Sequence, residues 1–144
     1  HITELNDNEN TPTTCHLTMV QYFVREGSLH AYHYQRSADV LLGLPHNLIQ
    51  HFALLMYFAY HSNLKIGSLR YQLGNAHIYQ HESHIETTKQ ILNCETNPEL
   101  DNSFELCYNY SVKNREGIHV FRADDFSMSG LIPNPKVTTR PKLL

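Results

Sequence analysis

The interpretation of this chain depends most on residues 35–47, which read Gln35-Arg36-Ser37-Ala38-Asp39-Val40-Leu41-Leu42-Gly43-Leu44-Pro45-His46-Asn47. Upstream of this stretch, Cys15 is followed directly by His16. Together the two segments offer a thiol, a guanidinium beside a hydroxyl, and a side-chain amide. These groups suit attack on a pyrimidine nucleotide, binding of its phosphate and recognition of its base. The pattern therefore indicates a nucleotide-modifying enzyme.

The residues before this stretch predict a β-hairpin. Leu17–Val24 and Leu29–Gln35 are rich in β-branched and aromatic residues, and 25–28 (Arg-Glu-Gly-Ser) supply a turn with glycine. The residues after it predict a helix, because Pro45 can open one and apolar residues recur at helical spacing from Leu48 through His61. These apolar residues are Leu48, Ile49, Phe52, Leu55, Met56 and Ala59.

Further elements are predicted along the rest of the chain. Asn63 and Gly67 close the long helix, and Ser68–Tyr79 is typical of a strand interrupted at Gly74-Asn75. His81–Leu92 predicts a second, more polar helix. Two more strands, Phe104–Val112 and Ile118–Phe121, are expected around a turn at 114–117. The mixture predicts an α+β fold with a largely antiparallel or mixed sheet and one long buried helix.

Length and charge limit the classes of function. The 144 residues suit a single domain, in which 1–14 form a polar lead-in and 131–144, with three prolines, form a C-terminal closing segment. The formal net charge is −3 and the 11 Lys and Arg are scattered, which argues against DNA or RNA as a partner. The apolar run 52–60 is too short to span a membrane, and three cysteines without paired spacing fit reduced thiols. We expect a cytoplasmic protein.

The 11 histidines raise the question of a metal site. His30 and His33 should point to opposite faces of a strand, because their spacing is odd. His77, His81 and His84 have no cysteine or carboxylate at a spacing that completes a four-ligand zinc set. We therefore expect no metal cofactor.

Five motifs in a fixed order resemble the thymidylate synthase family, and the match runs from Cys15 to the C-terminus. The motifs are Cys15-His16, Tyr34-Gln35-Arg36-Ser37 with Asp39, Gly43-Leu44-Pro45-x-Asn47, Gly74-x-x-His77-x-Tyr79, and Asp125-Phe126-x-x-x-Gly130-x-x-Pro133-x-Pro135. The resemblance implies a thymidylate synthase-like α+β fold that corresponds to the family's C-terminal catalytic part, without its N-terminal part. It also implies a homodimer formed by stacking of sheets.

The resemblance further implies a reaction and a co-substrate. The uracil ring of dUMP is too electron-poor at C5 to attack an electrophile unless a nucleophile first adds at C6, and a thiolate can do this. Cys15 would be that nucleophile, with the cation of Arg36 favouring its thiolate. Methylenetetrahydrofolate would then supply both the carbon and the hydride of the new methyl group, giving dTMP.

The matching positions carry over as expected site residues. Arg36 and Ser37 would hold the phosphate, Asn47 would read uracil, and His77 and Tyr79 would hold the ribose. Gln35 and Asp39 would also line the dUMP site, and Asp39, Gly43 and His46 would line the folate side. These residue types also occur in purely structural roles. A cysteine can be part of the core, an arginine can pair with a carboxylate, and an Asp or Asn can cap a helix.

Two alternative functions remain open at this point. His46 stands where phenylalanine is common in the family, and an imidazole there could hold a water molecule. That residue favours a dUMP hydroxymethyltransferase, in which water instead of hydride captures the exocyclic methylene. The other alternative is a nucleotide-binding homologue without catalysis, because the chain contains no tryptophan and lacks the family's usual N-terminal groups.

Overall fold

The structure of the chain, a computed structural model, describes residues 18–94, 105–109 and 123–130. Four expected features lie outside these ranges: the lead-in at 1–14, the proposed nucleophile Cys15, the strand at Ile118–Phe121 and the closing segment at 131–144. The described elements form a three-stranded sheet, two α-helices and a small two-stranded sheet. The predicted α+β fold is confirmed.

The predicted hairpin is confirmed as β1 (Thr18–Arg25) and β2 (Ser28–Asp39), which pair antiparallel. Their two-residue connection has positive φ at both positions, 52° at Glu26 and 73° at Gly27. Such turns match the right-handed twist of the strands, and glycine adopts positive φ without steric cost. The third strand, β3 (Lys65–His77), pairs parallel with β2, so the sheet is mixed and β2 is its central strand.

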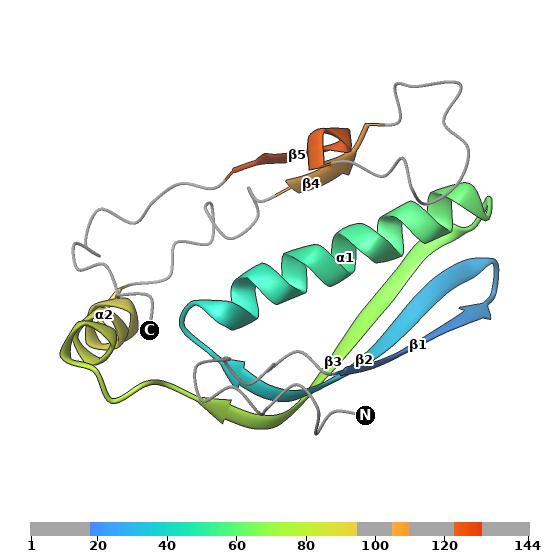
Figure 1. The fold of residues 1–144 in the computed structure, drawn as a ribbon. Coiled ribbons are helices and arrows are strands. Elements are labelled where there is room, and N and C mark those ends of the chain that lie inside the picture. The colour runs from blue at the N-terminus through green and yellow to red at the C-terminus, as the bar shows by residue number, and fades with distance from the viewer. Residues whose placement is uncertain (1–17, 95–104, 110–122, 131–144) are drawn as a thin grey trace, which may run out of the picture.

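The long helix α1 (Gly43–His61) connects β2 to β3 and packs on one face of the sheet (Figure 1). The sequence predicted that the helix starts near Leu48, but α1 begins five residues earlier, at Gly43. Apolar periodicity begins only at Leu48, whereas the helix already includes Pro45 in its first turn, a position where the missing N–H costs nothing. The predicted end at His61 is confirmed.

Two matched periodicities build the interface between α1 and β2. Alternate residues of β2 are buried, at Leu29, Ala31, His33 and Gln35. Every fourth residue of α1 forms the facing stripe, at Asn47, His51, Leu55 and Ala59. Two strand residues advance about 6.6 Å and four helical residues about 6 Å, so the layers stay in step. The interface is apolar at the end with Leu29 and Ala59, and it is polar at the end with Gln35 and Asn47.

The apolar end holds the hydrophobic core. Its buried members are Leu29, Ala31, Leu55 and Ala59. Partly buried side chains pack around them: Tyr22, Phe52, Phe58, Leu64 and Leu69. Because these residues anchor the far ends of β2 and α1, the polar end is held at a fixed register.

Strand β3 differs from its prediction, because it continues through Gly74-Asn75 without interruption. A Cβ at Gly74 would lie 2.5 Å from the Tyr34 hydroxyl oxygen and 2.8 Å from the Arg36 carbonyl oxygen. The glycine therefore permits a close approach between neighbouring strands and does not break β3. The strand ends at His77, two residues before the predicted end.

The remaining elements lie beyond the sheet. The second predicted helix is confirmed as α2 (Glu82–Leu92), where the side chain of His81 accepts a hydrogen bond from the Ser83 N–H. Strand β4 (Glu105–Tyr108) is a described part of the predicted Phe104–Val112, and it pairs antiparallel with β5 (Phe126–Ser129). The short 3-10 helix η3 (Ala123–Asp125) precedes β5. The sequence predicted neither η3 nor β5.

Helix α1 lies between the three-stranded sheet and the β4–β5 pair, as Figure 1 shows. An open apolar cavity of about 440 Å³ separates α1 from this pair. Its lining residues include Ile49, Ala53, Leu54, Leu106, Phe126 and Met128. Apolar side chains therefore occur on two sides of α1.

Candidate functional site

The carboxyl ends of β2 and β3 meet at one edge of the sheet, because the two strands are parallel. Asp39, the last residue of β2, lies opposite His77, the last residue of β3, and the Val40 N–H donates to the His77 carbonyl at 3.0 Å. The chain turns from this edge directly into the first residues of α1. Such edges commonly hold ligands in α/β units, and most of the predicted site residues are gathered here.

A buried amide pair forms the base of the site. The Asn47 amide nitrogen donates to Gln35 Oε1 at 3.2 Å, and the Gln35 amide nitrogen donates to the Ser37 carbonyl oxygen at 2.7 Å. Only 1 % of Gln35 and 3 % of Asn47 is exposed. Asn47 lies inside α1, whose N-cap is Leu42, so the alternative in which Asn47 only caps the helix is wrong.

The hydrogen bonds fix the orientation of both amides. The Ser37 carbonyl can only accept, so the Gln35 nitrogen must face it and the Gln35 oxygen must face Asn47. Asn47 must then present its NH₂ group to Gln35. The side chain of Asn47 is thus held in one orientation before any ligand binds.

A cluster of three aromatic rings adjoins this pair, and the sequence did not predict it. The Tyr71 hydroxyl donates to Gln35 Oε1 at 2.6 Å, and the Tyr71 ring stacks on His33 with centroids 4.2 Å apart. The His33 ring lies 3.8 Å from the His51 ring. One signal was available: His33 is two residues from Gln35 on the strand, and His51 is four residues from Asn47 on the helix.

Two further predicted residues, Asp39 and Gly43, flank the turn that leads from β2 into α1. Asp39 accepts a hydrogen bond from the Leu41 N–H at 3.0 Å, so it stabilises the turn before α1, and the helix N-cap is Leu42. Gly43 lies beside Asp39, since a Cβ placed on it would be 3.6 Å from the Asp39 Cβ. Gly43 and Asp39 are therefore neighbours at the sheet edge.

His46 is exposed near the start of α1. Its Nδ1 lies 2.7 Å from the Leu42 carbonyl oxygen. Because a carbonyl can only accept, Nδ1 carries the proton. In the neutral imidazole, Nε2 is then an acceptor that faces away from this bond.

His77 and Tyr79 lie together at the end of β3. Their rings are 5.1 Å apart between centroids and nearly perpendicular, at 84°. Tyr79 is exposed, and His77 is half-buried with no hydrogen-bond partner for its Nδ1 among the described residues. The two side chains are thus near enough to contact one small group together.

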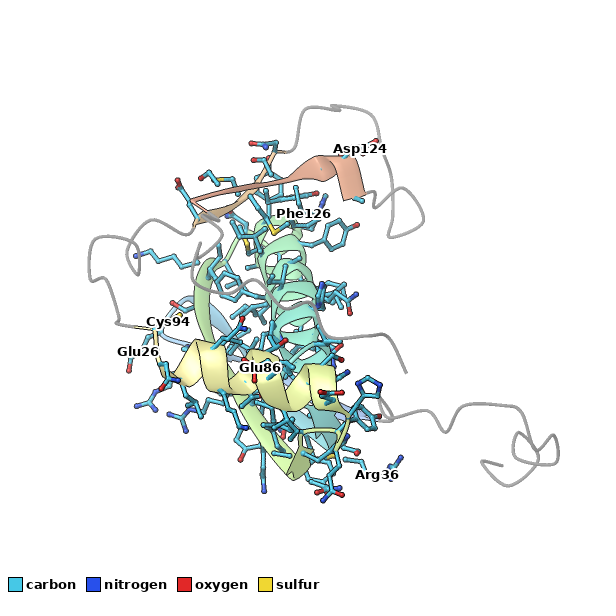
Figure 2. All side chains as sticks on the ribbon, turned by 90° about the vertical axis from the view of Figure 1, so that its left-hand side faces the viewer. Glu26, Arg36, Glu86, Cys94, Asp124 and Phe126 are labelled. Atoms are coloured by element: carbon cyan, nitrogen blue, oxygen red, sulfur yellow. The ribbon has the colours of Figure 1, made fainter. Side chains whose placement is uncertain are left out.

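Arg36 and Ser37 close the series on β2. Arg36 is exposed and alternates with the buried Gln35, and Figure 2 shows it at the lower margin of the molecule. Its side chain therefore lies on the opposite side of β2 from Gln35 and Asn47. Ser37 is half-buried. Cys15 is outside the described residues, three positions before Thr18, which pairs with Gln35.

Cys94 and Cys107 are both half-buried free thiols. Burial, together with a hydrogen bond to Glu105 and the charge of Glu105, raises the pKa of the Cys107 thiol. A raised pKa lowers the thiolate fraction at neutral pH, so Cys107 is a poor nucleophile. The Cys94 thiol donates to the Gln90 carbonyl at 3.1 Å at the end of α2, away from the sheet edge (Figure 2).

The part of the chain that the structure describes holds no group of three His, Cys, Asp or Glu side chains suited to a metal ion. The expected opposition of two histidines is confirmed, because His30 contacts the Ser68 hydroxyl at 3.0 Å while His33 is fully buried on the α1 side. Neither α1 nor α2 combines the length and hydropathy that crossing a membrane requires.

Comparison with known proteins identifies the family. The thymidylate synthase family model matches residues 2–142. The thymidylate synthase of Corynebacterium aurimucosum is 34% identical over 125 residues, 85% of this chain and 42% of that protein. The thymidylate synthase of Zymomonas mobilis is 33% identical over 137 residues, 95% of this chain and 43% of that protein. This chain thus spans less than half the length of these relatives, and it belongs to the thymidylate synthase family.

Proposed function

We propose that the protein converts dUMP to dTMP, with methylenetetrahydrofolate as the donor of both the carbon and the hydride. One observation carries this proposal: the buried pair of Gln35 and Asn47, which fixes the orientation of an amide at the sheet edge. Family membership supports the same reaction, because the two relatives described above are named thymidylate synthases.

The fixed amide of Asn47 suits uracil. Uracil presents an acceptor at O4 beside a donor at N3, and cytosine presents the reverse pair. An amide held in one orientation can donate to O4 through its NH₂ group and accept from N3 through its oxygen, so it pairs with uracil at both points. Cytosine would meet donor with donor and acceptor with acceptor. Buried mismatches of this kind are costly, so the site should reject cytosine strongly.

Cys15 serves as the nucleophile in the proposed reaction. Its sulfur adds to C6 of the uracil ring, which makes C5 electron-rich enough to form a bond to the one-carbon unit. Loss of the C5 proton and cleavage of the bond between the one-carbon unit and N5 of the folate then leave an exocyclic methylene on C5, while the sulfur remains on C6. Hydride transfer from the tetrahydrofolate to this methylene gives the methyl group and expels the sulfur from C6. The products are dTMP and dihydrofolate.

The other site residues bind the two substrates. Arg36 and Ser37 hold the phosphate, for which a planar guanidinium and a hydroxyl are suitable donors. His77 and Tyr79, with rings 5.1 Å apart, hold the ribose. Asp39, Gly43 and His46 line the side that receives the folate, a placement supported by their position around the first turn of α1.

A homodimer is part of the proposal. Helix α1 covers one face of the three-stranded sheet, and the opposite face carries exposed apolar side chains, among them Met19 and Phe23. Apolar residues on an uncovered sheet face favour contact with another protein surface. Stacking of this face on a second copy of the chain would cover it, as the family resemblance implies.

Trapping with 5-fluoro-dUMP tests the proposed reaction. Fluorine at C5 cannot leave as a proton does, so the ternary complex with methylenetetrahydrofolate stops as a covalent adduct. Intact mass should show one nucleotide and one folate per chain, and peptide mapping should place the nucleotide on Cys15. Cys15→Ser should form no adduct, whereas Cys94→Ser should form it normally. Label on Cys94 or Cys107 would refute the assignment.

His46 favours a second candidate, a dUMP hydroxymethyltransferase. The Leu42 carbonyl holds the proton on Nδ1, so Nε2 is an acceptor able to orient a water molecule. Such a water would attack the exocyclic methylene and give hydroxymethyl-dUMP with tetrahydrofolate. Product analysis separates the two reactions, because only methylation yields dihydrofolate. Nucleotide binding without either product would indicate a homologue that only binds.

A further inference from the structure

We propose that Tyr71 is a positioning residue for base selection, whose hydroxyl holds Gln35 and thereby fixes the amide of Asn47. The inference rests on the proposed function, in which Asn47 reads the base. Tyr71 lies outside the sequence motifs that predicted the site, and its side chain would touch neither the nucleotide nor the folate in this role.

The contacts form a short chain of hydrogen bonds. Tyr71 donates to Gln35 Oε1 at 2.6 Å, and Asn47 donates to the same oxygen at 3.2 Å. Gln35 is held at its other end by the Ser37 carbonyl at 2.7 Å. A Gln35 amide that rotated by half a turn would set its oxygen against the Ser37 carbonyl oxygen and its NH₂ group against the NH₂ group of Asn47. Tyr71 supplies the shortest of them, so it should contribute strongly to the orientation.

The backbone aims Tyr71 at this oxygen. Ile66 pairs with Leu29 and Leu69 pairs with Ala31, so β3 advances by three residues where β2 advances by two. Such a bulge reverses the direction of every later side chain on the bulged strand. After it, Leu69 and Tyr71 share the α1 side of the sheet, and Tyr71 lies opposite His33.

Stacking fixes the ring that carries the hydroxyl. The Tyr71 and His33 rings are 4.2 Å apart between centroids and almost parallel, at 9°. The ring of His51, one helical turn after Asn47, lies 3.8 Å from the His33 ring between centroids. Burial also raises the pKa of the Tyr71 hydroxyl, so it remains protonated, and able to donate, at neutral pH.

Tyr71→Phe isolates the hydroxyl, because the stacked ring remains. The Asn47 amide should then rotate more freely and admit cytosine more easily. Titration calorimetry should show the ratio of dCMP to dUMP dissociation constants falling by about threefold to tenfold. A ratio equal to that of the parent protein would overturn the inference while leaving the proposed function intact.

Tyr32→Phe is the matched control. Tyr32 also donates to a glutamine, Gln72, at 3.1 Å, but on the exposed opposite face of the same sheet. Its removal should leave the selectivity ratio unchanged. A similar fall in both variants would show that any lost tyrosine–glutamine bond loosens the sheet, and it would overturn a specific role for Tyr71.

A second measurement needs no nucleotide. Side-chain amide signals in ¹H–¹⁵N spectra, assigned through Asn47→Asp and Gln35→Glu, report the order of both amides. In Tyr71→Phe the two side-chain amide signals of Asn47 should shift and broaden, and in Tyr32→Phe they should not. An unchanged Asn47 signal in Tyr71→Phe would refute the inference. If the parent protein bound neither nucleotide, the proposed function would fail, and these signals would still decide whether Tyr71 orders Asn47.

Discussion

Gln35 uses both ends of its side-chain amide within the protein, and its oxygen accepts a hydrogen bond from the Asn47 amide. The orientation follows from the Ser37 carbonyl, which can accept but not donate. In the proposed function, the orientation in which Asn47 reads the base therefore depends on a backbone atom of β2 and on Tyr71. Neither group contacts the base in the proposed complex.

Asn47→Asp tests this selection at the residue itself. A carboxylate cannot donate to O4 of uracil, but it can accept from the N4 amino group of cytosine, and a protonated oxygen or a bridging water can donate to cytosine N3. We expect a loss of at least about tenfold in dUMP affinity and relatively tighter dCMP binding. Competitive titration of both nucleotides measures the ratio. Asn63→Asp, at an exposed residue after α1 with φ of 54°, controls for the added charge. An unchanged preference in Asn47→Asp would contradict base reading.

The free energy of unfolding should fall at alkaline pH as two tyrosines lose their protons. Burial raises the pKa of Tyr22 and Tyr71 above the ordinary value of 10.0. The unfolded chain therefore loses these protons first, and the stabilisation is present below about pH 10 and lost as pH rises through the folded pKa. Urea unfolding of the parent and of Tyr22→Phe,Tyr71→Phe between about pH 8 and pH 11 checks this. The double variant should lose stability less steeply, and parallel curves would contradict the assignment.

Sequence reasoning found the residues whose type and spacing signal chemistry, such as Asp39, Gly43, Asn47, His77 and Tyr79. The structure gathers these five at one sheet edge. Sequence reasoning could not find the residues that hold these side chains in place, because His33, His51 and Tyr71 belong to no motif. Their roles depend on a strand bulge and on the register between a helix and a strand, which local patterns do not contain.

At the scale of elements, α1 and β2 form one interface that is apolar at one end and polar at the other. Sequence periodicity was read from apolar residues alone, so the helix was predicted to begin at Leu48 and the polar residues Asn47 and His51 were not counted as inward-facing. The hairpin was predicted well because Glu26-Gly27 specifies its turn locally. Strand β5 was missed, since four residues give little periodicity and its pairing partner is distant in sequence.

Leu55 lies at the centre of the apolar end and is fully buried. Leu55→Ala should therefore lower the free energy of unfolding by about 2–5 kcal/mol, through lost burial and the cavity left behind. Leu92, which is 77% exposed on α2, is the matched control, and Leu92→Ala should change stability by less than about 0.5 kcal/mol. Urea unfolding followed by circular dichroism measures both. Equal effects would contradict the assignment of the core to the α1–β2 interface.

At the scale of the whole molecule, the described part has three layers: the mixed sheet, α1, and the β4–β5 pair (Figure 1). The site lies where the sheet edge meets the first turns of α1, so the core and the site share the same two elements. The sheet face that no described element covers is the surface on which we expect a second copy of the chain. The two relatives are about twice as long as this chain.

The most direct test of the proposed function is turnover of dUMP with methylenetetrahydrofolate, followed by separation of nucleotides and folates. The account predicts dTMP and dihydrofolate in equal amounts, no reaction of dCMP, and no product from Cys15→Ser. Hydroxymethyl-dUMP with tetrahydrofolate would instead support the second candidate. Formation of neither nucleotide product by the parent protein would contradict the proposed catalysis.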